Sequence, residues 1–188
     1  TKEIDIWDCG CGYGSTGFFL AMNGIKSHGT TIGDHYINGI EKRRKFWDKY
    51  GDSNLFTVSY QHLPESRPSE SSYDVILIQD TLHHMEPLQD IIQILYHTLK
   101  NEGKIIISEP NGNNIFYRIK HYLRRGNRRI ENKYDKQLKK MILYGNENLK
   151  SFELWKKIFE EVNFKIGKDV MYIKFFPPHF YTGKNSDT

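Results

Sequence analysis

The stretch Ile6-Trp7-Asp8-Cys9-Gly10-Cys11-Gly12-Tyr13-Gly14 decides the fold of this chain. It starts as a short apolar strand that ends in Asp8, and glycine then occupies every second position. A strand, a tight glycine turn and a helix N-terminus together make a site where backbone approaches a ligand closely and N–H groups face negative charge. We therefore expect this loop to hold a nucleotide-like cofactor, with side chains excluded at Gly10, Gly12 and Gly14.

Outward from the loop, β-branched and aromatic runs alternate with helical patterns, which is typical of parallel β–α–β units. The sequence predicts an α/β, doubly wound fold with helices on both faces of a mostly parallel sheet. The predicted strands are residues 3–8, 26–32, 55–60, 74–79 and 104–108, and a last strand or hairpin runs through 164–166 and 171–176. The clearest helices are residues 87–100 and 152–162, each with apolar side chains on one face.

Length and composition favour one soluble domain. The chain has 188 residues, and it has no apolar run near the ~20 residues that span a bilayer. The first residues lack the apolar core of a signal peptide, so we expect a cytoplasmic protein. Cys9 and Cys11 are predicted to be reduced loop residues, and the histidines show no metal-ligand spacing, so no metal site is expected.

Three segments in order resemble the class I, Rossmann-like methyltransferases of the broad small-molecule type. They are the glycine stretch, residues 73–85 with Gln79-Asp80-Thr81-Leu82-His83-His84-Met85, and residues 99–110 with Ser108-Glu109-Pro110. The resemblance implies seven strands, the last antiparallel, in one methyltransferase domain over 1–188 that lacks its N-terminal helices. It also implies S-adenosylmethionine across the carboxyl ends of the first strands. The residues implied to hold it are Asp8, Gly10, Cys11, Gly12 and Gly14, with Gln79 and Asp80 at its methionine end.

Two positions depart from that family pattern. The acid that usually binds the ribose hydroxyls aligns with Thr31, whose hydroxyl can make one hydrogen bond, and Asp34 is the fallback. The acid usual near the adenine amino group aligns with Ser59, so adenine contacts are expected from Ser59, the backbone, Tyr60 or Gln61.

Transfer of a methyl group from a sulfonium mainly requires alignment of the two reactants, and orientation can supply ~7–11 kcal/mol of such a barrier. An acceptor of high pKa also needs a base. His83 and His84 follow the fourth strand, where the resemblance implies the reacting centre. Either of them could take the proton, and both could instead be packing or turn residues.

Residues 115–140 contain ten Lys or Arg against two acids, whereas the rest of the chain has 17 basic and 21 acidic residues. The segment begins as a basic amphipathic helix, so we expect residues 111–150 to form a basic helical insert or lid. Such a segment could contact a membrane surface or anionic lipid, bind a phosphorylated substrate, or be a solvated charged face. Nucleic acid is the less favoured partner, because no aromatic RNA-binding signature accompanies the charge.

These observations predict S-adenosylmethionine-dependent methyl transfer to a small-molecule acceptor, which could be anionic or lipid-linked. Two alternatives stay open. One is an NAD(P)-dependent oxidoreductase that uses Gly12-x-Gly14-x-x-Gly17 with Asp34 on the ribose. The other is a non-catalytic binding domain on the same fold, which the changes at Thr31 and Ser59 would suit.

Overall fold

A computed structural model describes residues 3–167 of the 188-residue chain. Strands and helices alternate along it, as the sequence predicted. The strands of its main sheet are β1 (Ile6–Cys9), β2 (Ser27–Thr31), β3 (Phe56–Tyr60), β4 (Tyr73–Gln79) and β5 (Leu99–Ser108). The helices are α1 (Ser15–Met22), α2 (Asp34–Trp47), α3 (Leu88–Thr98), α4 (Ile115–Arg125) and α5 (Phe152–Glu160). A hairpin of β6 (Ile130–Asp135) and β7 (Lys140–Gly145) lies between α4 and α5, and short 3-10 turns lie at Ser53–Leu55 and Leu82–His84.

The main sheet is parallel and has the strand order β3-β2-β1-β4-β5. The α/β prediction is confirmed, and each of the five strands lies near its predicted position. The largest difference is β5, which begins at Leu99 because Leu99 pairs with Tyr73 before a register shift in the ladder. After β3 the chain crosses to the other side of β1 and forms β4. The carboxyl ends of β1 and β4 therefore mark the switch point at which open α/β sheets bind ligands.

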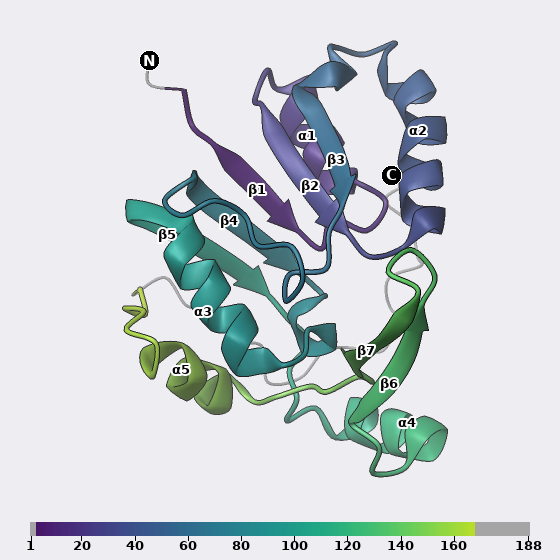
Figure 1. Cartoon of the computed structure of the whole chain (residues 1–188), viewed down its shortest axis with the longest axis vertical. Helices are drawn as coiled ribbons and strands as arrows, with labels where there is room; N and C mark the ends of the chain where they lie inside the picture. The colour runs from purple at the N-terminus through teal and green to yellow at the C-terminus, as the bar shows by residue number, and fades with distance from the viewer. Residues whose placement is uncertain (1–2, 168–188) are drawn as a thin grey trace, which may run out of the picture.

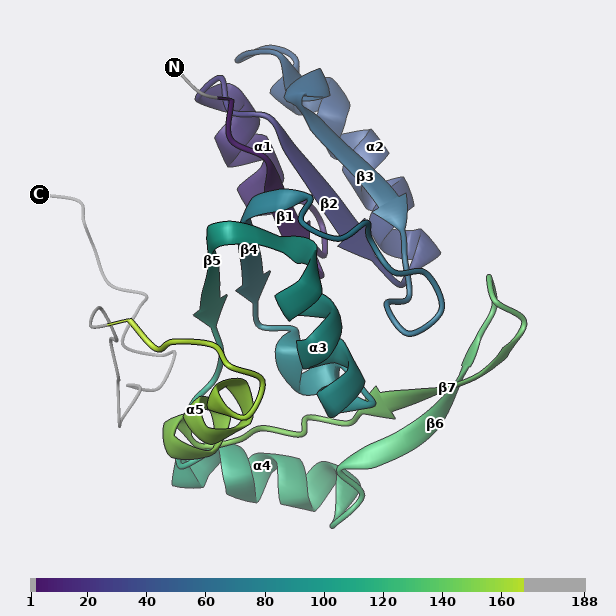
Figure 2. The ribbon, with the colours of Figure 1, turned by 60° about the vertical axis from the view of Figure 1, so that its left-hand side comes forward.

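Helices cover both faces of the sheet (Figures 1 and 2). On one face, Phe18 of α1 and Ile40 of α2 pack with Phe56 in one buried cluster. On the other face, the apolar stripe of α3 packs against β1 and β4, and α5 extends the same cluster. Its buried members include Trp7, Ile76, Ile78, Leu82, Ile91, Ile92, Leu95, Trp155, Ile158 and Phe159. Burial of these side chains stabilises the packing of the helices on the sheet, and the parallel strands present their carboxyl ends along one edge.

The basic segment 115–140 is one helix followed by a hairpin, so the insert expected to be helical over 111–150 is helical only at Ile115–Arg125. The side-chain oxygen of Asn114 accepts hydrogen bonds from the amides of Phe116 and Tyr117 and so caps α4. Gly126 ends the helix with a φ of +61°, a conformation that glycine adopts without steric cost. The hairpin then turns back toward the strand ends of the main sheet (Figure 1).

The predicted seven-stranded sheet is shown only in part. Residues 164–166 were expected to be a strand, yet they have no regular structure, and Phe164 packs its ring on Phe159 at the end of α5. The predicted strand 171–176 lies outside the described residues. The hairpin β6–β7 is a separate antiparallel pair. Between residues 3 and 167, no helix has the length and apolar character needed to cross a bilayer.

Candidate active site

A cleft of about 460 Å³ lies at the switch point, a volume in the usual range of small-molecule sites. The glycine loop, the ends of β2 and β4 and the end of β7 form its walls. The structure places most of the predicted site residues on this cleft: Asp8, Gly10, Cys11, Gly12, Thr31, Gln61, Gln79, Asp80 and His84. Four others do not line it: Gly14, Ser59, Tyr60 and His83.

The glycine loop is anchored to β2 by its own backbone. The amides of Gly10 and Cys11 both donate to the carbonyl oxygen of Thr30, each at 2.9 Å. These two amides therefore hold the loop in place and do not face a ligand, contrary to the expectation from sequence. A Cβ on Gly10 would lie 2.5 Å from the side chain of Thr81, whereas one on Gly12 would meet no described atom within 4 Å. Gly10 thus permits close packing, and Gly12 keeps the cleft open.

Asp8 places a carboxyl group at the base of the cleft. The residue is 3% exposed, and this burial raises the pKa of Asp8 to about 6. A desolvated carboxylate is stabilised by nearby positive charge, because an opposite charge favours its ionised form. The position is therefore suited to a cationic group of a ligand.

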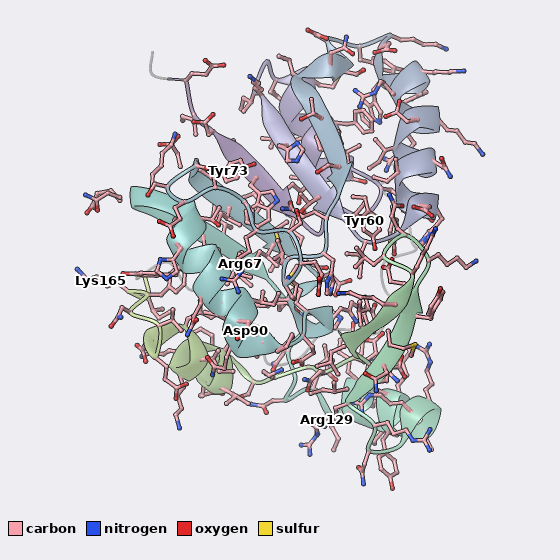
Figure 3. The ribbon with its side chains drawn as sticks, viewed as in Figure 1. Tyr60, Arg67, Tyr73, Asp90, Arg129 and Lys165 are labelled. Atoms are coloured by element: carbon pink, nitrogen blue, oxygen red, sulfur yellow. The ribbon has the colours of Figure 1, made fainter. Side chains whose placement is uncertain are left out.

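At the ends of β2 and β3, the structure separates the predicted residues. Thr31 and Gln61 reach the cleft, and the carbonyl of Thr31 accepts the amide of Gln61 at 3.0 Å. The hydroxyl of Ser59 instead pairs with Nε2 of His28 at 2.9 Å. The hydroxyl of Tyr60, which is labelled in Figure 3, donates to the carboxylate of Asp135 in the hairpin. Neither Ser59 nor Tyr60 lines the cleft: the partner of Ser59 lies on the neighbouring strand β2, and the partner of Tyr60 lies at the end of β6.

Gly14 lies behind the loop, at the start of α1. A Cβ there would lie 2.5 Å from the ring of Phe56, and its φ is +71°. Gly14 therefore serves the turn and the packing of α1 on the sheet. Asp34, the fallback ribose ligand, begins α2 and is not among the residues of the cleft wall.

Gln79 ends β4, Asp80 follows it, and both residues line the cleft. The hydroxyl of Thr16 donates to Oε1 of Gln79 at 2.6 Å. This hydrogen bond holds the side-chain amide of Gln79 against the start of α1. Asp80 has a φ of +52°, a left-handed conformation that is strained for a residue other than glycine. Such strain is concentrated at functional sites. Here it turns the chain sharply from β4 into the histidine turn.

His83 is buried behind the cleft wall. Its Nδ1 lies 2.6 Å from Oε2 of Glu109, and Nε2 lies 3.8 Å from Oε2 of Glu147. Glu109 also accepts the amides of Thr81 and Leu82, at 2.8 and 2.7 Å. Glu109 therefore ties the end of β5 to the turn after β4 and orients the His83 ring. Because a carboxylate accepts, Nδ1 of His83 carries the hydrogen.

His84 lines the cleft. Its Nδ1 lies 2.6 Å from the carbonyl oxygen of Gly145, and its ring stacks on Tyr144 with centroids 4.8 Å apart. A carbonyl can only accept, so Nδ1 carries the hydrogen and Nε2 keeps its lone pair. Burial lowers the pKa of His84, which favours the neutral ring. Of the two predicted histidines, only His84 can meet a bound molecule.

The hairpin contributes residues to the site that sequence reasoning did not find. Leu143 and Tyr144 line the cleft, and burial raises the pKa of Tyr144 to about 12. A Cβ on Gly145 would lie 2.1 Å from the carbonyl oxygen of His83, so glycine is required for this close approach. Sequence reasoning also missed Glu109, although its position directly after a predicted strand could have indicated a site residue. The contacts of the hairpin had no such signal, because they join segments about 60 residues apart in sequence.

The same region could also hold a metal ion, although sequence spacing predicted none. Single ligand atoms of His83, His84 and Glu147 lie within 4.8 Å of one another. A fourth side chain, His121 of α4, brings Nε2 to 3.6 Å from Oε2 of Glu147. Imidazole nitrogen and carboxylate oxygen are common ligands of divalent transition metals.

Comparison with known proteins adds information at the level of sequence families. A family model described as a methyltransferase domain matches residues 7–105. The chain is 31% identical over 111 residues to a ubiquinone biosynthesis O-methyltransferase of Rickettsia felis and 30% identical to the protein of that name in Rickettsia conorii. Each match covers 58% of this chain, and the chain spans only 43% and 36% of the two relatives.

Solved structures show the same fold at low sequence identity. Phosphoethanolamine N-methyltransferase 2 of Haemonchus contortus, solved with S-adenosyl-L-methionine, superposes with a TM-score of 0.62 at 18% identity. That match covers 86% of this chain and 33% of the other. A SAM-dependent methyltransferase of Archaeoglobus fulgidus gives 0.60 at 21% identity, with coverage of 86% and 61%.

Proposed function

Because this chain belongs to the methyltransferase domain family, we propose that it transfers a methyl group from S-adenosylmethionine to a small-molecule acceptor. One observation carries the proposal. One cleft is lined both by the open glycine loop at Gly12 and by His84 and Tyr144. A cofactor held against the glycine loop and an acceptor held at His84 and Tyr144 would share this cleft, as in-line transfer requires. The NAD(P) alternative is less well supported, since Asp34 is not on the cleft wall.

The residues of the cleft fit S-adenosylmethionine. When bound, this cofactor supplies a methyl group on a positively charged sulfur. The buried carboxyl of Asp8 suits its ammonium group, and the absence of a Cβ at Gly12 leaves space against the loop. We assign the cofactor contacts to Asp8, Gly10, Cys11, Gly12, Thr31, Gln61, Gln79 and Asp80. The other three predicted residues make contacts outside the cleft. Gly14 packs against Phe56, the hydroxyl of Ser59 pairs with His28, and the hydroxyl of Tyr60 donates to Asp135.

We assign the acceptor to the end of the cleft at His84. Its Nε2 is free to attract the hydrogen of an acceptor hydroxyl, and Tyr144 offers a flat ring beside it. The name of the Rickettsia relatives, O-methyltransferase, agrees with an oxygen acceptor. His83 is then a positioning residue, because its ring is held between Glu109 and Glu147 and is 3% exposed. The hairpin that supplies Tyr144 would act as the predicted lid.

A second proposal is that the protein binds its acceptor at a lipid surface. Helix α4 turns its apolar face outward, and His121 is its one buried residue. Figures 1 and 2 place this helix at the outer end of the molecule. A groove of about 680 Å³ beside it is lined by both apolar and basic side chains. The exposed apolar residues are Ile115, Phe116, Ile119, Tyr122 and Leu123, and Arg118, Lys120 and Arg124 flank them. This pattern suits an anionic lipid surface, and hence a lipid-linked acceptor.

Binding of S-adenosylhomocysteine, followed by calorimetry, tests the proposed function. Gly12→Val should abolish binding because the side chain would fill the open loop. Gly24→Val is the matched control: Gly24 also has a positive φ, +72°, with no atom near its Cβ, but it lies outside the cleft. Binding lost in the first variant and kept in the second supports the site. Equal binding in both, or quenching by NADH in place of S-adenosylhomocysteine binding, contradicts it.

The lipid proposal has its own test, cosedimentation with phosphatidylglycerol vesicles. Phe116→Ser, at a side chain in the outward face of α4, should weaken binding strongly. Phe19→Ser is the control, because Phe19 is a similarly exposed aromatic residue, 65% against 59%, on a different helix. Loss of binding in both variants, or equal binding to phosphatidylcholine vesicles, would contradict a basic docking face on α4.

A further inference from the structure

A cluster of three histidines and one glutamate lies where the turn after β4 meets the hairpin and α4. His83 and His84 come from the turn, Glu147 follows β7, and His121 projects from α4. Single ligand atoms of the first three lie within 4.8 Å of one another. The cluster is buried on the His83 side, and His84 opens on the cleft.

Both turn histidines are already oriented in the way that metal ligands are. Nδ1 of His83 is held by Glu109 and Nδ1 of His84 by the carbonyl of Gly145, at 2.6 Å each. In metal sites the second ring nitrogen of a ligating histidine is fixed by a carboxylate or a backbone carbonyl in this manner. Each ring is therefore left with an Nε2 lone pair.

The carboxylate of Glu147 supplies the third ligand atom. Its Oε2 lies 3.8 Å from Nε2 of His83 and 3.6 Å from Nε2 of His121. The side chain of Glu147 is 29% exposed, so it has room to close on an ion bound by the histidines. Asp80 and Glu109 add negative charge nearby, and both act electrostatically on the same group of residues.

We propose that His83, His84 and Glu147 bind one divalent transition-metal ion, with His121 as a fourth ligand. Two or three imidazoles and one carboxylate favour zinc or a neighbouring first-row metal, because magnesium and calcium prefer oxygen ligands throughout. The ion would join the hairpin and α4 to the sheet.

The metal site would also change how the acceptor is activated, and this part of the inference rests on the proposed function. In the metal-bound protein, Nε2 of His84 is a ligand and the ion lies at the acceptor end of the cleft. An acceptor hydroxyl bound to the ion would release its proton to solvent water more readily, because a bound cation lowers the pKa of an attached oxygen. The metal would then activate the acceptor hydroxyl in place of Nε2 of His84.

Titration of the dialysed full chain with Zn²⁺, and with Co²⁺ as a spectroscopic probe, tests the site. We expect one ion per chain, and loss of binding in Glu147→Gln and in His84→Ala. Glu109→Gln should weaken binding by about 10–100-fold, the usual effect of removing an outer partner of a ligating histidine. His97→Ala is the control, because His97 is an exposed histidine at the end of α3. Circular dichroism would verify that each variant is folded.

Two outcomes of the metal titration would overturn the proposed metal site. If neither ion binds stoichiometrically, or if Glu147→Gln and His84→Ala bind as tightly as the unchanged chain, the cluster is a network of histidine–glutamate pairs. Calorimetry with S-adenosylhomocysteine is independent of this readout. Metal binding without S-adenosylhomocysteine binding would contradict the proposed function and support the metal site. S-adenosylhomocysteine binding without metal binding would contradict the metal site alone.

Discussion

Replacement of Asp8 by asparagine should make the protein more stable and less able to bind its cofactor. Asp8 lies 3% exposed at the base of the cleft, and burial raises its pKa from the ordinary 3.8 to about 6. The ionised form of Asp8 therefore costs stability in the folded state. Asparagine has nearly the same shape and carries no charge, so it removes this cost.

The expected change in stability and the pH range over which it develops follow from the raised pKa of Asp8. A change of about 2 pKa units corresponds to about 3 kcal/mol, at 1.36 kcal/mol for each unit. Between pH 3.8 and about 6 the unfolded chain is ionised at this position while the folded chain still holds the proton, so stability falls as pH rises through this window. Above it the penalty is complete. We expect Asp8→Asn to gain roughly 3 kcal/mol at pH 8 and roughly 0.5 kcal/mol at pH 4.

Urea denaturation at a series of pH values, followed by circular dichroism, measures this difference. Asp90→Asn is the control, since Asp90 is exposed on α3 (Figure 3) and should change stability by less than about 0.5 kcal/mol. In parallel, Asp8→Asn should weaken S-adenosylhomocysteine binding about tenfold or more, because a charge-assisted contact is lost. A stability difference that does not vary with pH would refute the assignment of a raised pKa to Asp8.

Two further predictions concern the hairpin. Gly145→Ala should destabilise the fold by about 1–3 kcal/mol, because its Cβ would lie 2.1 Å from a backbone oxygen that cannot easily move; urea denaturation measures this, and an unchanged midpoint would show that the hairpin approaches less closely. Tyr60→Phe should cost about 1 kcal/mol and speed proteolysis within the hairpin, because it removes the hydrogen bond to Asp135 that ties β6 to β3; an unchanged cleavage rate would mean that this bond does not hold the hairpin.

The amino-acid sequence by itself determined the α/β alternation, the glycine loop after β1 and the position of the histidine turn after β4. These features depend on interactions between residues close in the chain: the period of apolar side chains, the positive φ that glycine adopts, and the order of strand, turn and helix. For the same reason, the sequence could place Asp8, Gly10 and Gly12 at one strand end without knowledge of the rest of the fold.

Only the tertiary structure decided which histidine faces the cleft. His83 and His84 are adjacent in sequence and equivalent in type, and they differ because Glu109 holds one ring inward and Gly145 holds the other at the cleft wall. Tertiary packing likewise turned Ser59 and Tyr60 away and brought Tyr144 and Glu147 in. These contacts join segments separated by 26 to 75 residues, so their distances are set by how the elements pack and not by any spacing along the chain.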